Sequence, residues 1–235
     1  MRRRASILIE EGSTRLLIDL SPDLRLQALD NGISTVDAML LTHDHADHMH
    51  GVDDAKGFNF HRKGPIPCYG DAVTLHALRE RFAYAIAKPD APYYGHKPAL
   101  EPIIIKPYQS VTLGAMEVKT FLQLHGKMPT MGVRVGNIAY STDVNNLPEK
   151  SLQALESLDV WVVDCLQREP APTHAHLAMA LGWVERLKPK LAILTHMSHV
   201  LEYGQMKREL PAGVIPAHDG LFIHMDTAIP GVFAY

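Results

Sequence analysis

Cysteine is scarce in this sequence, which has only Cys68 and Cys165 among its 235 residues. Two thiols so far apart cannot build a disulfide framework, and they argue against a zinc site made of cysteines. Two free, buried thiols are the usual state of a protein in a reducing compartment. We therefore expect a cytoplasmic protein without disulfide bonds.

Long apolar runs are missing as well. No run reaches the ~18 residues that a membrane-spanning helix needs. The start of the chain carries arginines, but its apolar stretch ends at Ile9 and is too short for a secretory signal. The sequence thus predicts no membrane partner and supports the cytoplasmic location.

Charge of one sign is not in excess either, since the net charge is -3 with histidine neutral. This balance gives no general electrostatic reason to expect nucleic acid as a partner. The short basic run Arg2–Arg4 is interpreted as a solvated terminus. Hydrophobic residues make up 46% of the chain, enough for a sizeable core, and we expect one domain over residues 1–235.

Histidine is abundant, with 14 copies, and it gathers in residues 42–48, which read Thr-His-Asp-His-Ala-Asp-His. An apolar run that predicts a strand comes directly before this group. His43 and His45 are two positions apart, so they face the same way in an extended segment. Asp47 and His48 follow a turn of the chain and can face a second point. The spacing indicates two adjacent metal ions, and hence a hydrolase.

The rest of the chain alternates between strand and helix patterns. Residues 88–102 hold four prolines and are predicted to form a long surface loop that helps to shape a substrate site. The predicted strands are 6–10, 15–19, 36–41, 66–69, 103–105, 110–112, 116–122, 133–135, 137–140, 160–164, 191–194, 214–215 and 221–223. The predicted helices are 23–31, 51–60, 72–87, 147–158, 176–187 and 206–210.

A two-metal hydrolase needs further nitrogen and oxygen ligands and one group that bridges the ions. The bridge is best an aspartate, because each carboxylate oxygen can bind one ion. Candidates should follow predicted strands, where side chains can converge. The residues that meet this condition are His125, Asp143, His196 and His218.

The motif His43-x-His45-x-Asp47-His48, followed by His125, Asp143 and His196, resembles the metallo-β-lactamase superfamily of dinuclear hydrolases. Four shorter motifs are His125-Gly126-Lys127-Met128-Pro129-Thr130-Met131-Gly132, Tyr140-Ser141-Thr142-Asp143, Thr173-His174-Ala175-His176-Leu177 and Leu194-Thr195-His196-Met197-Ser198-His199. These motifs are similar to the branch that contains the phosphoribosyl 1,2-cyclic phosphate phosphodiesterase, which is related to the tRNA 3′-end nucleases.

The resemblance implies a fold and a ligand set. The fold would be the four-layer αββα sandwich of that superfamily, with its usual first strand absent from this sequence. One metal ion would be held by His43, His45 and His125, and the other by Asp47, His48 and His196. Asp143 would bridge the two ions. Nitrogen and oxygen ligands suit zinc, manganese or iron and do not choose among them.

The resemblance also implies the chemistry. We expect a dinuclear metallohydrolase that attacks a small cyclic phosphate or nucleotide-like phosphodiester with a metal-bound hydroxide. His174 and Asp47 are the catalytic candidates, and His174 would act on the leaving oxygen. The expected partner is a small-molecule phosphodiester or nucleotide, without a strong nucleic-acid signal, and a homodimer stays open.

Several alternatives stay open at this stage. A thioester or lactone hydrolase, or a tRNA 3′-processing nuclease, could use the same metal centre, and a relative without activity could bind a partner only. Asp44 is expected to orient a ligand histidine or to cap the next helix. Further substrate-binding candidates are His50, His176, His199 and His218.

Overall fold

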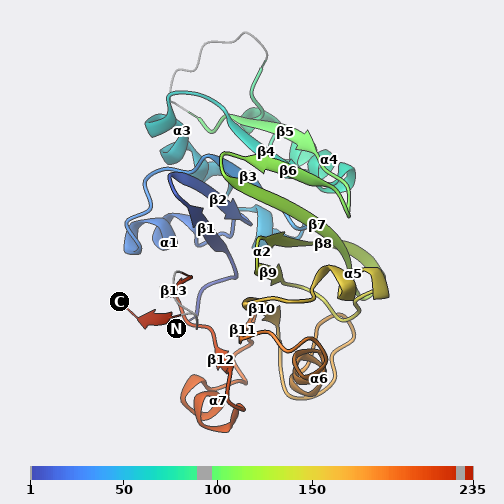
Figure 1. Ribbon diagram of the computed structural model, residues 1–235. Coiled ribbons are helices and arrows are strands. Elements are labelled where there is room, and N and C mark those ends of the chain that lie inside the picture. Colours follow the sequence, from blue (N-terminus) through green and yellow to red (C-terminus); the bar gives the residue numbers. More distant parts are fainter. Residues whose placement is uncertain (1, 89–96, 226–230, 235) are drawn as a thin grey trace. The chain divides into compact units, whose positions relative to one another are not determined.

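The computed structural model describes residues 2–88, 97–225 and 231–234, and it divides into two compact units (Figure 1). The first unit takes in residues 3–117, and the second takes in Arg2 and the described residues from Val118 onward. The prediction of one domain over the whole chain stays a prediction.

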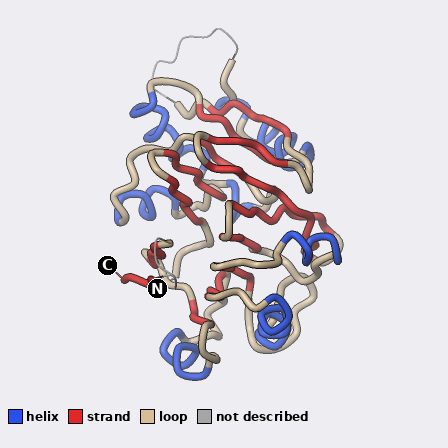
Figure 2. Tube along the Cα trace, viewed as in Figure 1, coloured by secondary structure: helices blue, strands red, loops and turns tan. Residues whose placement is uncertain are grey.

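Strands and helices alternate along both units, and the helices are short (Figure 2). Among the described residues, no helix is long and apolar enough to cross a membrane. The strands are β1 (Ile7–Glu11), β2 (Thr14–Ile18), β3 (Ala38–Leu40), β4 (Ile66–Gly70), β5 (Leu100–Ile104), β6 (Ser110–Leu113), β7 (Met116–His125), β8 (Met128–Val135), β9 (Ile138–Ser141), β10 (Val160–Asp164), β11 (Leu191–Thr195), β12 (Val214–Pro216), β13 (Leu221–His224) and β14 (Gly231–Ala234). The helices are α1 (Leu24–Asp30), α2 (Ala46–Met49), η1 (Val52–Ala55), α3 (Lys56–Arg62), α4 (Ala72–Arg81), η2 (Ala83–Ala85), α5 (Glu149–Ala154), α6 (Leu177–Leu187) and α7 (Tyr203–Glu209).

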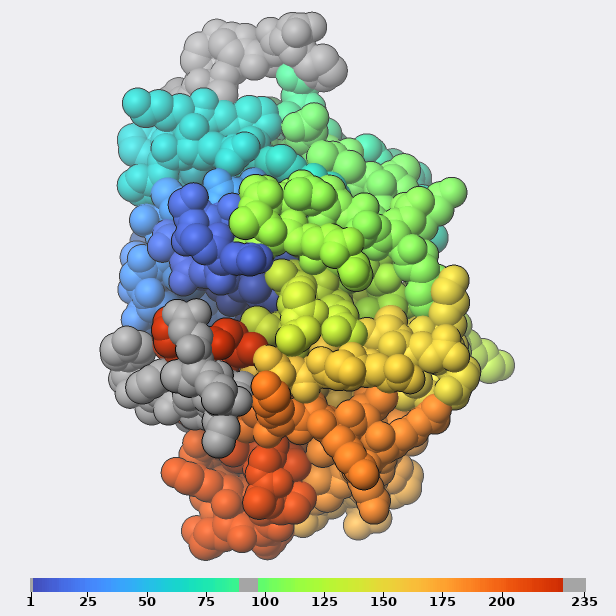
Figure 3. Space-filling view, viewed as in Figure 1, coloured from blue at the N-terminus to red at the C-terminus, as the bar shows by residue number. Residues whose placement is uncertain are grey.

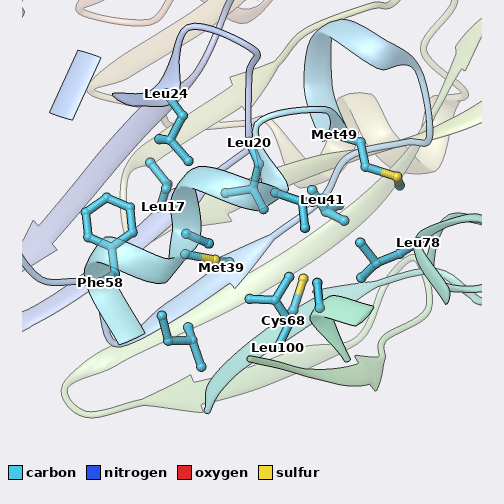
Figure 4. Packing of buried hydrophobic residues seen from close by; sticks show 14 of the residues in the cluster. Leu17, Leu20, Leu24, Met39, Leu41, Met49, Phe58, Cys68, Leu78 and Leu100 are labelled. Atoms are coloured by element: carbon cyan, nitrogen blue, oxygen red, sulfur yellow. The ribbon is translucent and has the colours of Figure 1, made fainter. Parts of the chain in front are cut away.

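The sheet of the first unit has the strand order β1-β2-β3-β4-β5. β1 and β2 form an antiparallel hairpin, and the pairs from β2 to β5 are parallel. Parallel strands need a cover on both faces, which explains their apolar sequences. Side chains from strands and helices, such as Met39 and Phe58, point toward one another in a common core (Figure 4).

The strands of the second unit lie in the order β12-β11-β10-β9-β8-β7. The pairs from β9 to β12 are parallel, whereas β8 pairs with β7 and with β9 in antiparallel fashion. The carboxyl ends of the parallel strands therefore meet at one edge of this sheet, where side chains that follow the strands can converge. Figure 3 shows the outer atoms of one face, coloured along the sequence from blue at the N-terminus to red at the C-terminus.

Some predicted boundaries are wrong for identifiable reasons. The predicted helix 72–87 ends at Arg81, because the chain then pairs with β5 through a bond from the Ala87 amide to the Leu100 carbonyl (2.8 Å). β5 begins at Leu100, inside the predicted loop 88–102, and tolerates Pro102 because it is an edge strand. Residues 89–96 of that loop lie outside the described residues.

Two further expectations need correction. The predicted strand 133–135 begins earlier, at Met128, because β8 returns along β7 in a tight hairpin. The basic run at the start of the chain is not simply solvated. Arg3 pairs with Asp30, Arg4 pairs with Asp23, and Arg2 donates to the Ser198 carbonyl at 2.7 Å.

The close contact between β7 and β8 gives a test of the packing. A Cβ atom added at Gly132 would lie 2.1 Å from the ring of Phe121, which is fully buried. Gly132→Ala should therefore lower the free energy of unfolding by about 1–3 kcal/mol. In α6, Gly182 has no atom within 4 Å of such a Cβ, so Gly182→Ala should raise stability by about 1 kcal/mol. Urea unfolding midpoints measure both, and a shift of the same sign in the two variants would contradict this packing.

The two thiols give a second test. Burial raises the pKa of both Cys68 and Cys165 to about 12. Because the pKa is raised on folding from the ordinary 9.0, the stability that this difference contributes is present below 9.0 and is lost as pH rises toward 12. At about pH 8 the folded protein should react very slowly with Ellman's reagent, since the thiolate is the reactive form. Unfolding in guanidinium chloride should release two thiols per chain, and rapid reaction of the folded protein would contradict their burial.

Candidate metal centre

The first group of candidate ligands lies in the first unit, after the carboxyl end of β3. His43 is buried there, and His45 has extended backbone and begins the short helix α2, which carries Asp47 and His48. The ring centroid of His43 lies 4.6 Å from that of His45 and 4.4 Å from that of His48. We call His43, His45, Asp47 and His48 the histidine cluster.

The buried carboxylate of Asp19 forms hydrogen bonds with His48 of this cluster and with Thr42, which precedes His43. Asp19 directly follows β2, and its Oδ1 accepts from the Thr42 amide at 2.8 Å. Its Oδ2 lies 2.8 Å from Nδ1 of His48 and 3.0 Å from the Thr42 hydroxyl. Sequence analysis missed Asp19. The signal was available, because an aspartate at the end of a strand that pairs in parallel with the strand before the histidines lies at the same sheet edge.

These bonds set which ring nitrogens face a metal. Because a carboxylate oxygen is an acceptor, Nδ1 of His48 donates to Asp19 and its Nε2 carries the lone pair. Burial raises the pKa of the Asp19 carboxyl, although the His48 and Thr42 contacts act in the opposite direction. A cation held by the nearby imidazoles would favour the charged carboxylate. The donor set of this cluster therefore fits a divalent metal ion.

The second group of candidates lies in the second unit, where β7, β9 and β11 end. Asp143 is buried, and its two oxygens face different histidines. Oδ2 lies 3.8 Å from Nε2 of His125, and Oδ1 lies 3.3 Å from Nε2 of His196. We call His125, Asp143, His174 and His196 the aspartate cluster. The two oxygens of this buried carboxylate therefore lie near different imidazoles.

His174 joins the aspartate cluster through Asp164, the last residue of β10. Nδ1 of His174 lies 3.0 Å from Oδ2 of Asp164, and the His174 ring stacks on His196 with centroids 5.0 Å apart. Asp164 also accepts from the Ala175 amide at 3.2 Å. Burial raises the pKa of Asp164, while His174 and His196 lower it. Sequence analysis placed Asp164 in a strand and missed this role.

His125 is oriented in the same manner. Its Nδ1 lies 2.7 Å from the Thr173 carbonyl, which can only accept, so Nδ1 carries the proton and Nε2 faces Asp143. The aspartate cluster thus also presents lone pairs that suit a metal ion.

Backbone strain marks the aspartate cluster and the aspartate that supports the histidine cluster. Asp19, Asp143 and His196 have φ of 66°, 50° and 55°, in the left-handed region that non-glycine residues seldom adopt. Such conformations persist where the surrounding structure holds them, and they gather at functional sites.

The other predicted residues lie apart from these contacts. His50 ends α2, is exposed and packs edge-on against Phe82 at 5.4 Å. His176 precedes α6, His199 is exposed, and His218 packs against Tyr203 at 5.7 Å. Their roles in substrate binding stay predictions.

The prediction that Asp44 caps the next helix is wrong, because helix α2 has no side-chain cap. The Asp44 carboxylate pairs with Arg81 at 2.6 Å. Its role in orienting a ligand histidine stays a prediction.

Comparison with known proteins identifies the family of the chain. Residues 14–197 match the family described as the Beta-lactamase superfamily domain. The chain belongs to the metallo-β-lactamase superfamily. The mixed α/β structure agrees with the fold of this superfamily, so the predicted family and fold class are confirmed. Membership supports a metallo-β-lactamase fold hydrolase, and the clustered histidine and aspartate side chains could hold divalent metal.

Solved structures and curated relatives indicate the branch of the superfamily to which the chain is similar. The chain is 34% identical to a structure described as a new diphosphatase from the PhnP family, with a TM-score of 0.84, over 93% of this chain and 83% of that one. It is 32% identical over 223 residues to the octanoyltransferase of Porphyromonas gingivalis, which is 94% of this chain and 44% of the relative. It is 26% identical over 137 residues to the ribonuclease Z of Methanopyrus kandleri, 57% of this chain and 44% of the relative. The predicted PhnP-like branch is confirmed, and the chain spans less than half the length of these curated relatives.

The contacts of Asp19 predict its effect on metal binding. Asp19→Ala removes the acceptor of the His48 Nδ1 proton, so His48 loses its fixed orientation. Metal affinity should fall by roughly 10–100-fold, as it does when similar supporting groups are removed. Competition with a chromophoric chelator measures the affinity. Asp23→Ala, which removes an aspartate paired with Arg4 nearby in the chain, is the control and should bind metal normally. Unchanged affinity in folded Asp19→Ala would contradict the assigned role.

Proposed function

We propose that this protein is a metal-dependent phosphodiesterase that acts on a small cyclic phosphate or a nucleotide-like phosphodiester. The observation that carries the proposal is the arrangement around Asp143. Its oxygens face His125 and His196, and Nε2 of His174 lies 4.0 Å from Oδ2. This arrangement combines a bridging carboxylate with an imidazole that is suited to proton transfer.

The two clusters would supply one set of ligands for two ions. His43, His45 and His125 would hold one ion, Asp47, His48 and His196 would hold the other, and Asp143 would bridge them. Support comes from membership of the superfamily and from the lone pairs that the fixed imidazoles present within each unit. Zinc, manganese and iron all suit these nitrogen and oxygen donors. When bound, two such ions supply a water of lowered pKa and stabilise charge on phosphoryl oxygens.

His174 would protonate the leaving oxygen of the substrate. Its Nδ1 is held by Asp164, so Nε2 is the atom that exchanges a proton with the substrate. The Asp164 carboxylate stabilises the imidazolium form, as the aspartate does in a serine protease triad. Such a general acid contributes roughly 10²–10⁴ in rate. Asp47 would contribute as a metal ligand with a side chain that is 37% exposed, and so within reach of the reacting water.

The similarity to a diphosphatase supports phosphoryl chemistry. Hydrolysis of a diphosphate breaks a bond between phosphorus and its anhydride oxygen, and hydrolysis of a phosphodiester breaks a bond between phosphorus and an ester oxygen; in both, water attacks phosphorus and one bridging oxygen leaves. The same groups can therefore serve both substrates, so diphosphates belong in any substrate panel. The ribonuclease Z relative adds a precursor tRNA to that panel.

A thioester hydrolase is a second candidate, because one curated relative is named for octanoyl transfer. A metal-activated water can attack an acyl carbon as well as phosphorus. Thiolates leave without protonation, so this reaction would not depend on His174. Comparing octanoyl-coenzyme A with phosphodiesters in the wild type and in His174→Ala separates the two functions.

Variants of the aspartate cluster test the proposal directly. His174→Ala should lower kcat by roughly 10²–10⁴ on a cyclic nucleotide, whose alkoxide leaves poorly, while metal content stays normal. The loss should be smaller on bis(p-nitrophenyl) phosphate, since nitrophenolate needs little protonation. Asp143→Ala should lose both activity and metal, as elemental analysis of the purified protein would show.

His61→Ala is the matched control, because His61 is an exposed histidine on α3. Its activity should equal that of the wild type on every substrate. Equal activity of Asp143→Ala and His61→Ala would refute the assignment of the site. Turnover of octanoyl-coenzyme A but of no phosphate ester would favour the thioesterase.

A further inference from the structure

Three side chains at the end of α4 and in η2 contact the segment that carries the histidine cluster. Arg81 pairs with the Asp44 carboxylate at 2.6 Å and also donates to the Asp44 backbone carbonyl. The Phe82 ring meets the His50 ring edge-on, with centroids 5.4 Å apart. The Tyr84 hydroxyl donates to Asp53 at 3.4 Å. We call Arg81, Phe82 and Tyr84 the α4 latch. All of these contacts lie within the first unit.

The position of Asp44 gives the Arg81 contact its importance. Asp44 stands between His43 and His45, and its carbonyl belongs to the peptide bond that leads into His45. A guanidinium that binds this carbonyl and the carboxylate together constrains the orientation of the peptide more than a single charge could. Asp19 and Thr42 orient His48 and His43, whereas Arg81 reaches the backbone beside His45.

The exposure of the pair argues against a purely stabilising role. The side chains of Arg81 and Asp44 are 42% and 23% exposed, and ion pairs of this kind contribute little to the free energy of folding. The effect that we expect from the contact between Arg81 and Asp44 is therefore to orient the peptide bond that precedes His45.

We propose that Arg81 is a positioning residue that sets the direction of His45 and thereby the metal affinity of the histidine cluster. Phe82 and Tyr84 extend this latch to α2 and η1 through His50 and Asp53. The proposal rests on the proposed metal centre. It adds that an arginine outside the ligand set controls how tightly the metal is held.

Metal affinity without substrate is the decisive measurement. Zinc binding to the purified chain would be measured by competition with a chromophoric chelator. Arg81→Ala should weaken binding by roughly tenfold, at the lower end of the range for supporting groups, and Arg81→Lys should restore only part of it. Arg79→Ala is the matched control, because Arg79 is an exposed arginine in the last turn of the same helix. It should bind zinc as the wild type does.

A double-mutant cycle tests whether the effect passes through Asp44. If it does, Asp44→Ala with Arg81→Ala should bind zinc no more weakly than Arg81→Ala alone, because Arg81→Ala already removes the contacts to both the carboxylate and the carbonyl of Asp44. Spectra of the cobalt-substituted protein should change in Arg81→Ala and stay unchanged in Arg79→Ala, which a general loss of stability would not produce. If Arg81→Ala does not fold, Arg81→Lys and Asp44→Asn answer the same question.

The outcomes separate this proposal from the proposed function. Failure of the wild type to bind metal would overturn the metal centre itself. Normal binding by both the wild type and Arg81→Ala would overturn the α4 latch and leave the metal centre standing. Equal losses in Arg79→Ala and Arg81→Ala, or additive losses in the double variant, would also overturn the latch.

Discussion

The buried carboxylate of Asp19 is the contact on which the geometry of the histidine cluster depends. It lies where β2 ends and binds the Thr42 amide, the Thr42 hydroxyl and Nδ1 of His48. A buried carboxyl group is unfavourable unless its oxygens are satisfied, and here each oxygen has partners. Those partners are the residues that must be held still for His43 and His48 to face a metal. The free energy of burying Asp19 is thus offset by bonds that orient the ligands.

The second unit repeats this arrangement with different residues. Asp164 ends β10, is buried, and binds His174 as well as backbone amides. Parallel strands explain why both supporting aspartates are found at strand ends. The backbone bonds of such a sheet stop at its carboxyl edge, so polar side chains there can satisfy the next loop and one another. The left-handed backbone of Asp19 in the first unit, and of Asp143 and His196 in the second, shows local strain at the strand ends of each sheet.

The candidate ligands of the proposed centre are held by hydrogen bonds from residues that would not bind the metal themselves. Three of the candidate ligand imidazoles have a partner on Nδ1, and the partners differ in kind. His48 uses a carboxylate, His125 a backbone carbonyl and His43 a hydroxyl. Arg81 acts one step further out, on the backbone between two candidate ligands. A metallohydrolase built in this manner can change its affinity through residues that never touch the metal.

The sequence by itself determined the elements that depend on local pattern. Alternating and apolar runs predicted nearly all described strands and helices, and the spacing from His43 to His48 indicated metal ligands. Boundaries failed where long-range pairing replaced local preference, as at Ala87 and Pro102.

Only the tertiary structure decided which residues support the ligands. The supporting residues are separated in sequence from the groups that they contact. Asp19 contacts His48, and Asp164 contacts His174. The largest separation is 37 residues, between Arg81 and Asp44, which precedes His45. Nothing in local periodicity marks one aspartate at a strand end as a partner and another as a solvated charge. The physical reason is that a hydrogen bond depends on the distance and direction between two atoms, and for residues far apart in the chain these are set by the packing of strands and helices.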